Sequence, residues 1–108
     1  MTAILFAAQR ITAMLLAFAV TVHLATILYA VRGGLTAGEV LARTRGSGWF
    51  LAFYLMFVVA VAIHAPIGLR NILKEWTPFH IRAIDIAVAL FGVLLLALGL
   101  RAAFAVFL

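Results

Sequence analysis

The chain has 108 residues, of which 69% are hydrophobic and 10% are charged, and its formal net charge is +5. This balance is far from that of a soluble domain and is typical of a protein whose solvent is lipid. The Lys and Arg residues stand singly between apolar runs, a pattern that favours headgroup anchoring over nucleic-acid binding. The sequence has no cysteine, which excludes thiolate metal sites and cysteine-held iron–sulfur clusters within it.

The three longest apolar runs are each long enough to cross a bilayer, because about 20 helical residues at 1.5 Å per residue span its hydrocarbon core. We therefore predict an all-α integral membrane protein with transmembrane helices at about residues 4–31, 49–73 and 79–108. Residues 1–108 then form a single membrane-anchor domain. We expect its three helices to be part of a larger helical bundle.

The segment between the first two spans, residues 32–48, is polar and contains turn signals. Thr36 is followed three residues later by Glu39, a capping-box pattern that predicts a short helix ending near Thr44. We expect this segment to lie flat at the membrane surface.

Two prolines mark features of the second and third spans. Proline removes a backbone donor and clashes with the carbonyl four residues earlier, so Pro66 acts on Ala62 and predicts a bend near His64. Thr77 and Pro78 are expected to open the third helix, because proline suits a first helical turn.

With three spans, the N-terminus and the second connection share one side of the membrane, and the first connection and the C-terminus share the other. The basic residues are divided almost evenly between the two sides, so the positive-inside rule discriminates weakly. We expect a multi-pass protein of a bacterial-type inner membrane, with its N-terminus in the cytoplasm.

His64 is the first candidate functional residue, because an ionisable side chain inside a membrane span is costly. Gly68, one turn later, would leave a groove where a flat macrocycle could approach, and Arg70 could reach back toward a haem propionate. The competing interpretation is a neutral histidine that is hydrogen-bonded between helices. Spacing alone does not decide between the two.

The depth of the histidines separates them. If Arg10 and Arg70 mark the same interface, His64 lies about 9 Å deep and His23 about 20 Å deep. Two axial ligands of one haem face each other across the same ring, so these histidines are not expected to share one. The residues around His23 in the sequence slightly favour a structural role for it.

A polar cluster lies at the mouth of the first span, where Gln9, Arg10 and Thr12 could hydrogen-bond a quinone carbonyl or a haem propionate. The alternative for Arg10 is a snorkelling anchor at the membrane surface.

The third span begins with charged and polar residues. His80 is expected to be an interfacial residue. Asp85 is expected to form an interfacial salt bridge with Arg82 or Arg70.

The arrangement of His64, Gly68, Leu69 and Arg70 resembles the second-helix signature of the cytochrome b membrane-anchor subunit of succinate dehydrogenase and fumarate reductase. The resemblance implies that His64 is an axial ligand of haem b. Gln9, Arg10 and Thr12 are similar to a first-helix element of that family, whose Arg lies by the quinone site and the haem propionates. Four residues depart from the pattern: Phe6 and Gln9 stand where the family has serine and histidine, Asn71 replaces the aromatic residue or histidine after Arg70, and Glu75 stands where aspartate is usual.

The resemblance also implies cofactors and partners. Haem b and a quinone, either ubiquinone or menaquinone, would be bound by this chain, whereas FAD and iron–sulfur clusters would belong to a flavoprotein subunit and an iron–sulfur subunit. The chain offers one histidine at each depth, so the opposite ligand of each haem would come from a second membrane-anchor subunit or a second copy. His23 resembles the first-helix ligand of dihaem members of the superfamily, which implies a second haem.

Electrons would pass between the iron–sulfur partner and the quinone pool, so the chain would be a subunit of an oxidoreductase that does not itself bind the dicarboxylate. Two other functions stay open at this point. One is a non-redox scaffold that docks a soluble partner. The other is a small transporter subunit that uses His64, Arg70 and Asp85 as a proton relay.

Overall fold

The structure, a computed structural model, describes residues 2–108 as four helices joined by short connections. The helices are α1 (Ala3–Gly33), α2 (Ala37–Thr44), α3 (Gly48–Trp76) and α4 (Ile81–Phe107). Three of them, α1, α3 and α4, are long and apolar enough to cross a membrane. The predicted all-α fold of a multi-pass membrane protein is confirmed.

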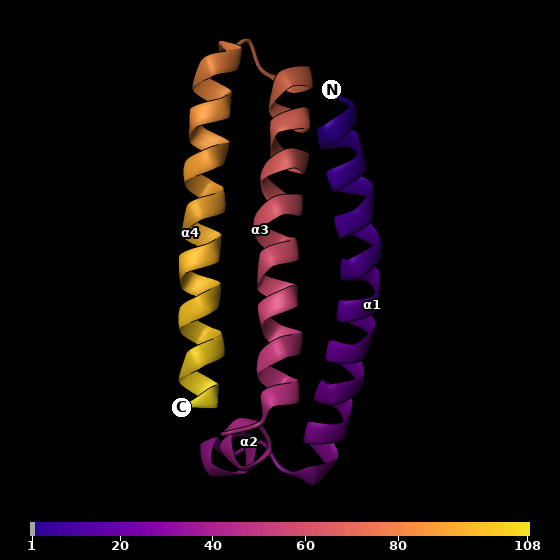
Figure 1. The fold of residues 1–108 in the computed structure, drawn as a ribbon, viewed down its shortest axis with the longest axis vertical. Helices are drawn as coiled ribbons and strands as arrows, with labels where there is room; N and C mark the ends of the chain where they lie inside the picture. Colours follow the sequence, from indigo (N-terminus) through magenta and orange to yellow (C-terminus); the bar gives the residue numbers. More distant parts are fainter. Residues whose placement is uncertain (1) are drawn as a thin grey trace.

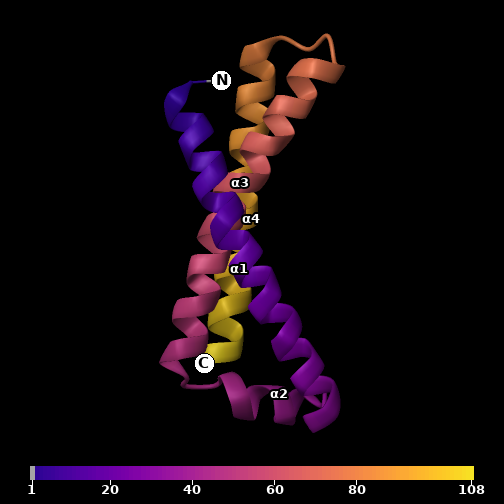
Figure 2. The same ribbon diagram turned by 90° about the vertical axis from the view of Figure 1, so that its right-hand side faces the viewer.

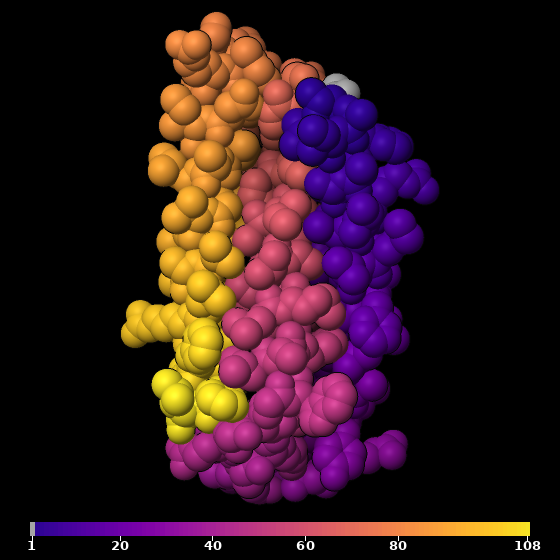
Figure 3. Space-filling view, in the orientation of Figure 1, coloured from indigo at the N-terminus to yellow at the C-terminus, as the bar shows by residue number. Residues whose placement is uncertain are grey.

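The three long helices stand in a row, with α3 between α1 and α4 (Figure 1). The N-terminus and the α3–α4 connection lie at one end of the row, and α2 and the C-terminus lie at the other (Figure 1). Figure 3 shows the same row as three bands on one face, with α3 uncovered between its neighbours. A row of three helices encloses little, so most apolar side chains face lipid or another protein. The few buried apolar residues of the core are Ala19, Ala60, Ile84, Val88 and Ala103.

Helices α3 and α4 approach closely at glycine. A Cβ added to Gly92 of α4 would lie 2.9 Å from Cγ of Pro66 and 3.2 Å from the carbonyl oxygen of Ala62, both in α3. Pro66 has no N–H to bond that carbonyl. Helix α3 continues through Pro66, and Figure 2 shows it changing direction about halfway along, which agrees with the predicted bend.

Helices α1 and α3 cross like the strokes of an X (Figure 2). Below the crossing they diverge, and α2 spans the gap between their ends (Figure 2). The hydroxyl of Thr44 donates to the carbonyl of Val106, 2.9 Å away, and the N–H of Gly46 donates to that of Phe107, also 2.9 Å away. These bonds fix the end of α2 to α4 and satisfy carbonyls that a helix C-terminus leaves unpaired.

The short helix begins where the sequence predicts. The hydroxyl of Thr36 accepts a hydrogen bond from the N–H of Glu39 at 3.2 Å and donates to its carboxylate at 2.7 Å. In Figure 2, α2 runs crosswise to the long helices, the orientation expected of a segment that lies along a membrane surface.

The predicted opening of the third span is wrong by a few residues. Thr77 ends α3 in an extended conformation, and Pro78 lies in the connection. The physical reason is that a residue before proline is driven out of the helical region. Helix α4 instead begins after His80, whose Nδ1 accepts the N–H of Arg82 at 3.1 Å and so caps the helix.

Candidate functional site

The first candidate site lies where α1 and α3 meet in the half of the molecule nearer the N-terminus. Nδ1 of His64, on α3, lies 3.2 Å from the hydroxyl oxygen of Thr12 on α1. Thr12 is one of two buried polar residues in the described part of the chain, with 5% of its surface exposed, whereas His64 is half-buried. The sequence places both residues in the site, and the structure brings them into contact.

The hydrogen bonds of Thr12 favour one tautomer of His64. A hydroxyl has one proton, and the oxygen of Thr12 lies 2.7 Å from the carbonyl of Ala8 but 3.1 Å from that of Gln9. We assign the proton to the shorter bond, so the hydroxyl oxygen accepts from His64 and Nδ1 carries the ring hydrogen. Nε2 of His64 then bears a lone pair, and it has no hydrogen-bond partner among residues 2–108.

Gln9 lies over Gly68, where the sequence predicts an open groove. A Cβ added to Gly68 would lie 3.3 Å from Nε2 of Gln9, so this glycine accommodates α1 and the groove is closed on that side. The side-chain oxygen of Gln9 is buried and has no hydrogen-bond partner within residues 2–108. A buried acceptor without a partner is costly, so it marks a place where a donor is missing.

Arg70 of α3 and Arg10 of α1 differ in their surroundings. Nε of Arg70 donates to Asp85 of α4 at 2.6 Å, which confirms one of the two predicted partners of Asp85. This ion pair joins α3 to α4, whereas His64 faces α1, so the three residues of a supposed proton relay do not form one chain. Arg10 is exposed, with its guanidinium carbon 5.7 Å from the ring centre of Phe6.

His23 forms a second cluster nearer α2. Its Nδ1 lies 3.3 Å from the hydroxyl of Tyr54, and its ring packs edge-on against Tyr54 and Phe57 with ring centres 5.7 Å apart in both pairs. Along α1, His23 is eleven residues, or about 16 Å, beyond Thr12. The structure therefore separates His23 from His64, as the sequence predicts, and the two cannot bind one iron.

Sequence reasoning did not single out Tyr54 as a partner of His23. The spacing of α1 contains part of the signal: Thr12, Ala19 and His23 are seven and four residues apart and so share one face of a helix. That spacing predicts that His23 faces the neighbour of Thr12. It does not say which residue of the neighbour His23 meets, because that depends on how α3 is rotated and how the helices cross.

The comparisons with known proteins add no assignment. No protein-family model, curated protein or solved structure matches the chain.

Proposed function

We propose that the chain is a membrane-anchor subunit of a succinate dehydrogenase-like or fumarate reductase-like respiratory complex, in which His64 binds the iron of a b-type haem. The observation that carries the proposal is the contact between His64 and Thr12, which leaves the second ring nitrogen free as a ligand. The resemblance of the segment from His64 to Arg70 to the family's second-helix signature supports the same role.

The surroundings of His64 fit the requirements of an axial ligand. A ligating histidine is neutral at the bonding nitrogen and donates its other N–H to a neighbour, which holds the ring in one orientation. Thr12 accepts that hydrogen. A haem needs only one or two protein ligands, so the chain can bind one although no three His, Asp or Glu side chains gather within residues 2–108.

The opposite ligand is expected from another polypeptide. His23 is too far along α1 to reach the same iron, and His80 is taken up in capping α4. The row of helices leaves a broad face uncovered (Figure 3), on which a second membrane-anchor subunit or a second copy would complete the bundle. If His23 binds a second haem, that haem also needs a ligand from outside the chain.

Arg10 is better placed than Arg70 to meet a propionate or a quinone oxygen. Arg70 already donates to Asp85, whereas Arg10 has no carboxylate partner in the described residues. Gln9 precedes Arg10 in α1, but its side-chain oxygen is buried, so a ubiquinone or menaquinone would meet the exposed guanidinium of Arg10 and not that oxygen. Arg10 would orient the quinone and water would supply protons, because Asp85 is paired with Arg70 where α3 meets α4.

A bound haem would supply one-electron transfer near the quinone. The residues of this chain would hold and orient the cofactors. Thr12 would fix the imidazole of His64, and Arg10 would polarise a quinone oxygen. Electrons would arrive from the iron–sulfur subunit, and the flavoprotein subunit with its FAD would perform the dicarboxylate chemistry.

The test is a reduced-minus-oxidised absorption spectrum of the intact complex, with the haem content measured for each variant. We expect b-type bands in the wild type and their loss in His64→Ala. His80→Ala is the matched control, because His80 is an exposed histidine outside the site, and it should keep the bands. His23→Ala keeps all the haem if one is bound and half of it if two are bound.

The proposal fails if the complex has no b-type haem or if His64→Ala leaves the spectrum unchanged. A non-redox scaffold predicts the first result and tolerance of His64→Leu. A transporter subunit predicts transport in liposomes that contain this chain alone.

A further inference from the structure

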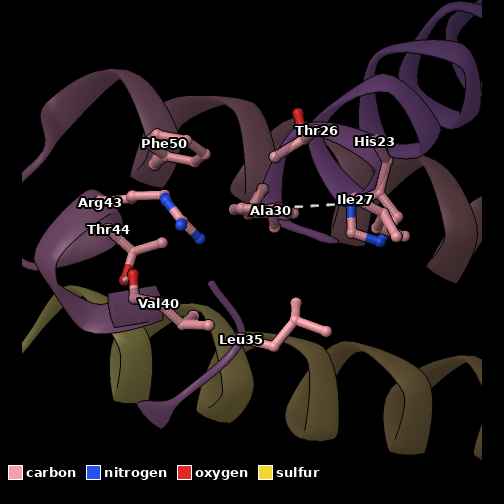
Figure 4. A pocket seen from close by; sticks show the side chains of 10 residues that line it. His23, Thr26, Ile27, Ala30, Leu35, Val40, Arg43, Thr44 and Phe50 are labelled. Atoms are coloured by element: carbon pink, nitrogen blue, oxygen red, sulfur yellow. Dashed lines mark hydrogen bonds between the residues drawn. The ribbon is translucent and has the colours of Figure 1, made fainter. Parts of the chain in front are cut away.

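A hollow lies at the α2 end of the molecule, where α1 and α3 diverge below their crossing (Figure 2). We call it the α2 hollow. Its volume is about 220 Å³. Apolar side chains from α1, α2 and α3 line most of it, among them Ile27 of α1, Val40 of α2 and Phe50 of α3 (Figure 4). The hydrogen bonds of α2 to α4 hold its floor in place.

Arg43 brings a positive charge into this apolar space. Figure 4 shows its guanidinium pointing from α2 into the hollow. One N–H bonds the carbonyl of Gly34 at 3.0 Å, and the guanidinium carbon lies 5.7 Å from the ring centre of Tyr29. The nearest acid in sequence, Glu39, accepts the hydroxyl proton of Thr36. Over residues 2–108, Arg43 forms no salt bridge.

The two threonine hydroxyls of the hollow are already hydrogen-bonded within the chain. The hydroxyl of Thr26 donates to the carbonyl of Val22, and that of Thr44 is bonded to Val106. Nδ1 of His23 lies 3.3 Å from the hydroxyl of Tyr54. Arg43 is therefore the one charged group of the lining, with N–H donors to spare.

The occupant must be narrow and apolar, with an anionic end at the level of α2. A helix with its side chains is 10–12 Å wide, whereas a cube of about 220 Å³ has an edge of about 6 Å, or about 9 Å once the radius of a water molecule is added at each wall. A helix of a partner protein does not fit, but an acyl chain does. The end of α1 and α2 together carry three arginines, Arg32, Arg43 and Arg45, against the single acid Glu39, and basic pockets between membrane helices recognise anionic headgroups.

We propose that the α2 hollow binds one anionic phospholipid, with the phosphate on Arg43 and an acyl chain between α1 and α3 that reaches toward His23. The site is separate from the His64 cluster. It does not depend on haem binding at His64, whereas a haem on His23 would compete with the acyl chain for the same space.

The test compares phosphatidylglycerol with phosphatidylcholine of the same acyl chains. The full chain in non-ionic detergent is titrated with each lipid, and the lipid-bound fraction is measured by native mass spectrometry. We expect phosphatidylglycerol to bind about fivefold more tightly, the factor expected for one arginine near a lipid charge. Arg43→Gln should abolish this preference and Arg43→Lys should retain it.

Two controls separate the hollow from general charge and general lipid contact. Arg45→Gln removes an exposed arginine from the same end of α2, outside the lining, and should keep the preference. Ala30→Leu should fill the hollow and weaken the binding of both lipids. Ala25→Leu, at an exposed position of α1 outside the lining, should not.

The proposal is overturned if the two lipids bind equally to the wild type or if Arg45→Gln acts like Arg43→Gln. It is also overturned if inorganic phosphate competes as well as phosphatidylglycerol, because the site would then bind a bare anion. Circular dichroism of each variant establishes that the helices are intact. If Arg43→Gln does not fold, the comparison of Ala30→Leu with Ala25→Leu still tests whether the lipid lies in the α2 hollow.

Discussion

Gly92 should be intolerant of even one added methyl group. In Gly92→Ala the new Cβ would meet Cγ of Pro66 at 2.9 Å and the carbonyl oxygen of Ala62 at 3.2 Å. Neither neighbour is the end of a flexible side chain, since one is a proline ring within α3 and the other is backbone. The helices α3 and α4 must therefore separate locally, or α3 must bend further.

The expected loss of stability follows from two opposing effects. Overpacking a closely packed interface costs about 1–3 kcal/mol, and rigid neighbours put this contact toward the upper part of that range. Replacing glycine by alanine inside a helix stabilises the helix by about 0.5–1 kcal/mol. We expect Gly92→Ala to lower the free energy of unfolding by about 1–2 kcal/mol.

The assay is unfolding of the purified chain in mixed micelles with increasing dodecyl sulfate, followed by circular dichroism. Gly38→Ala is the matched control, because a Cβ at Gly38 meets nothing within 4 Å, and it should be neutral or stabilising. Adding Pro66→Ala to Gly92→Ala removes the ring and should recover part of the loss, a coupling that a double-mutant cycle measures. If Gly92→Ala is as stable as Gly38→Ala, the inferred close contact does not exist.

Two further predictions concern the hydrogen bonds of the candidate site. Thr12→Val keeps the shape of the side chain but removes the acceptor for His64, so haem affinity should fall about 10–100-fold, as measured by haem titration of the apo-complex. An unchanged affinity would show that Thr12 does not orient the ligand. Asp85→Asn should lower the free energy of unfolding by no more than about 1 kcal/mol, because the carboxylate facing Arg70 is half-exposed, and a loss of several kcal/mol in the same micelle assay would contradict this.

Much of the architecture follows from local properties of the sequence. The three spans and the helix that starts at Thr36 were predicted and are confirmed. The start of α4 was predicted too early because Pro78 was interpreted as a first-turn residue, whereas its effect on Thr77 ends α3. Both effects of Pro78 act on its neighbours in sequence, and only the structure of the α3–α4 connection shows which one applies.

The sequence also nominated the side chains of the candidate site, because polar residues in apolar runs stand out by themselves. It paired Asp85 with Arg70 or Arg82, and the structure selects Arg70. It did not predict that Gln9 covers Gly68, that Thr12 meets His64, or that Tyr54 meets His23. These contacts join different helices, so they depend on how each helix is rotated.

The sequence alone determined that this is a membrane protein of three spans with two histidines at different depths, because hydrophobic length and helical rise are properties of one segment at a time. The tertiary structure decided that His64 meets Thr12 and where the α2 hollow lies. Both results come from the angle at which α1 crosses α3. That angle is set by side-chain packing between two helices, and no single segment encodes it.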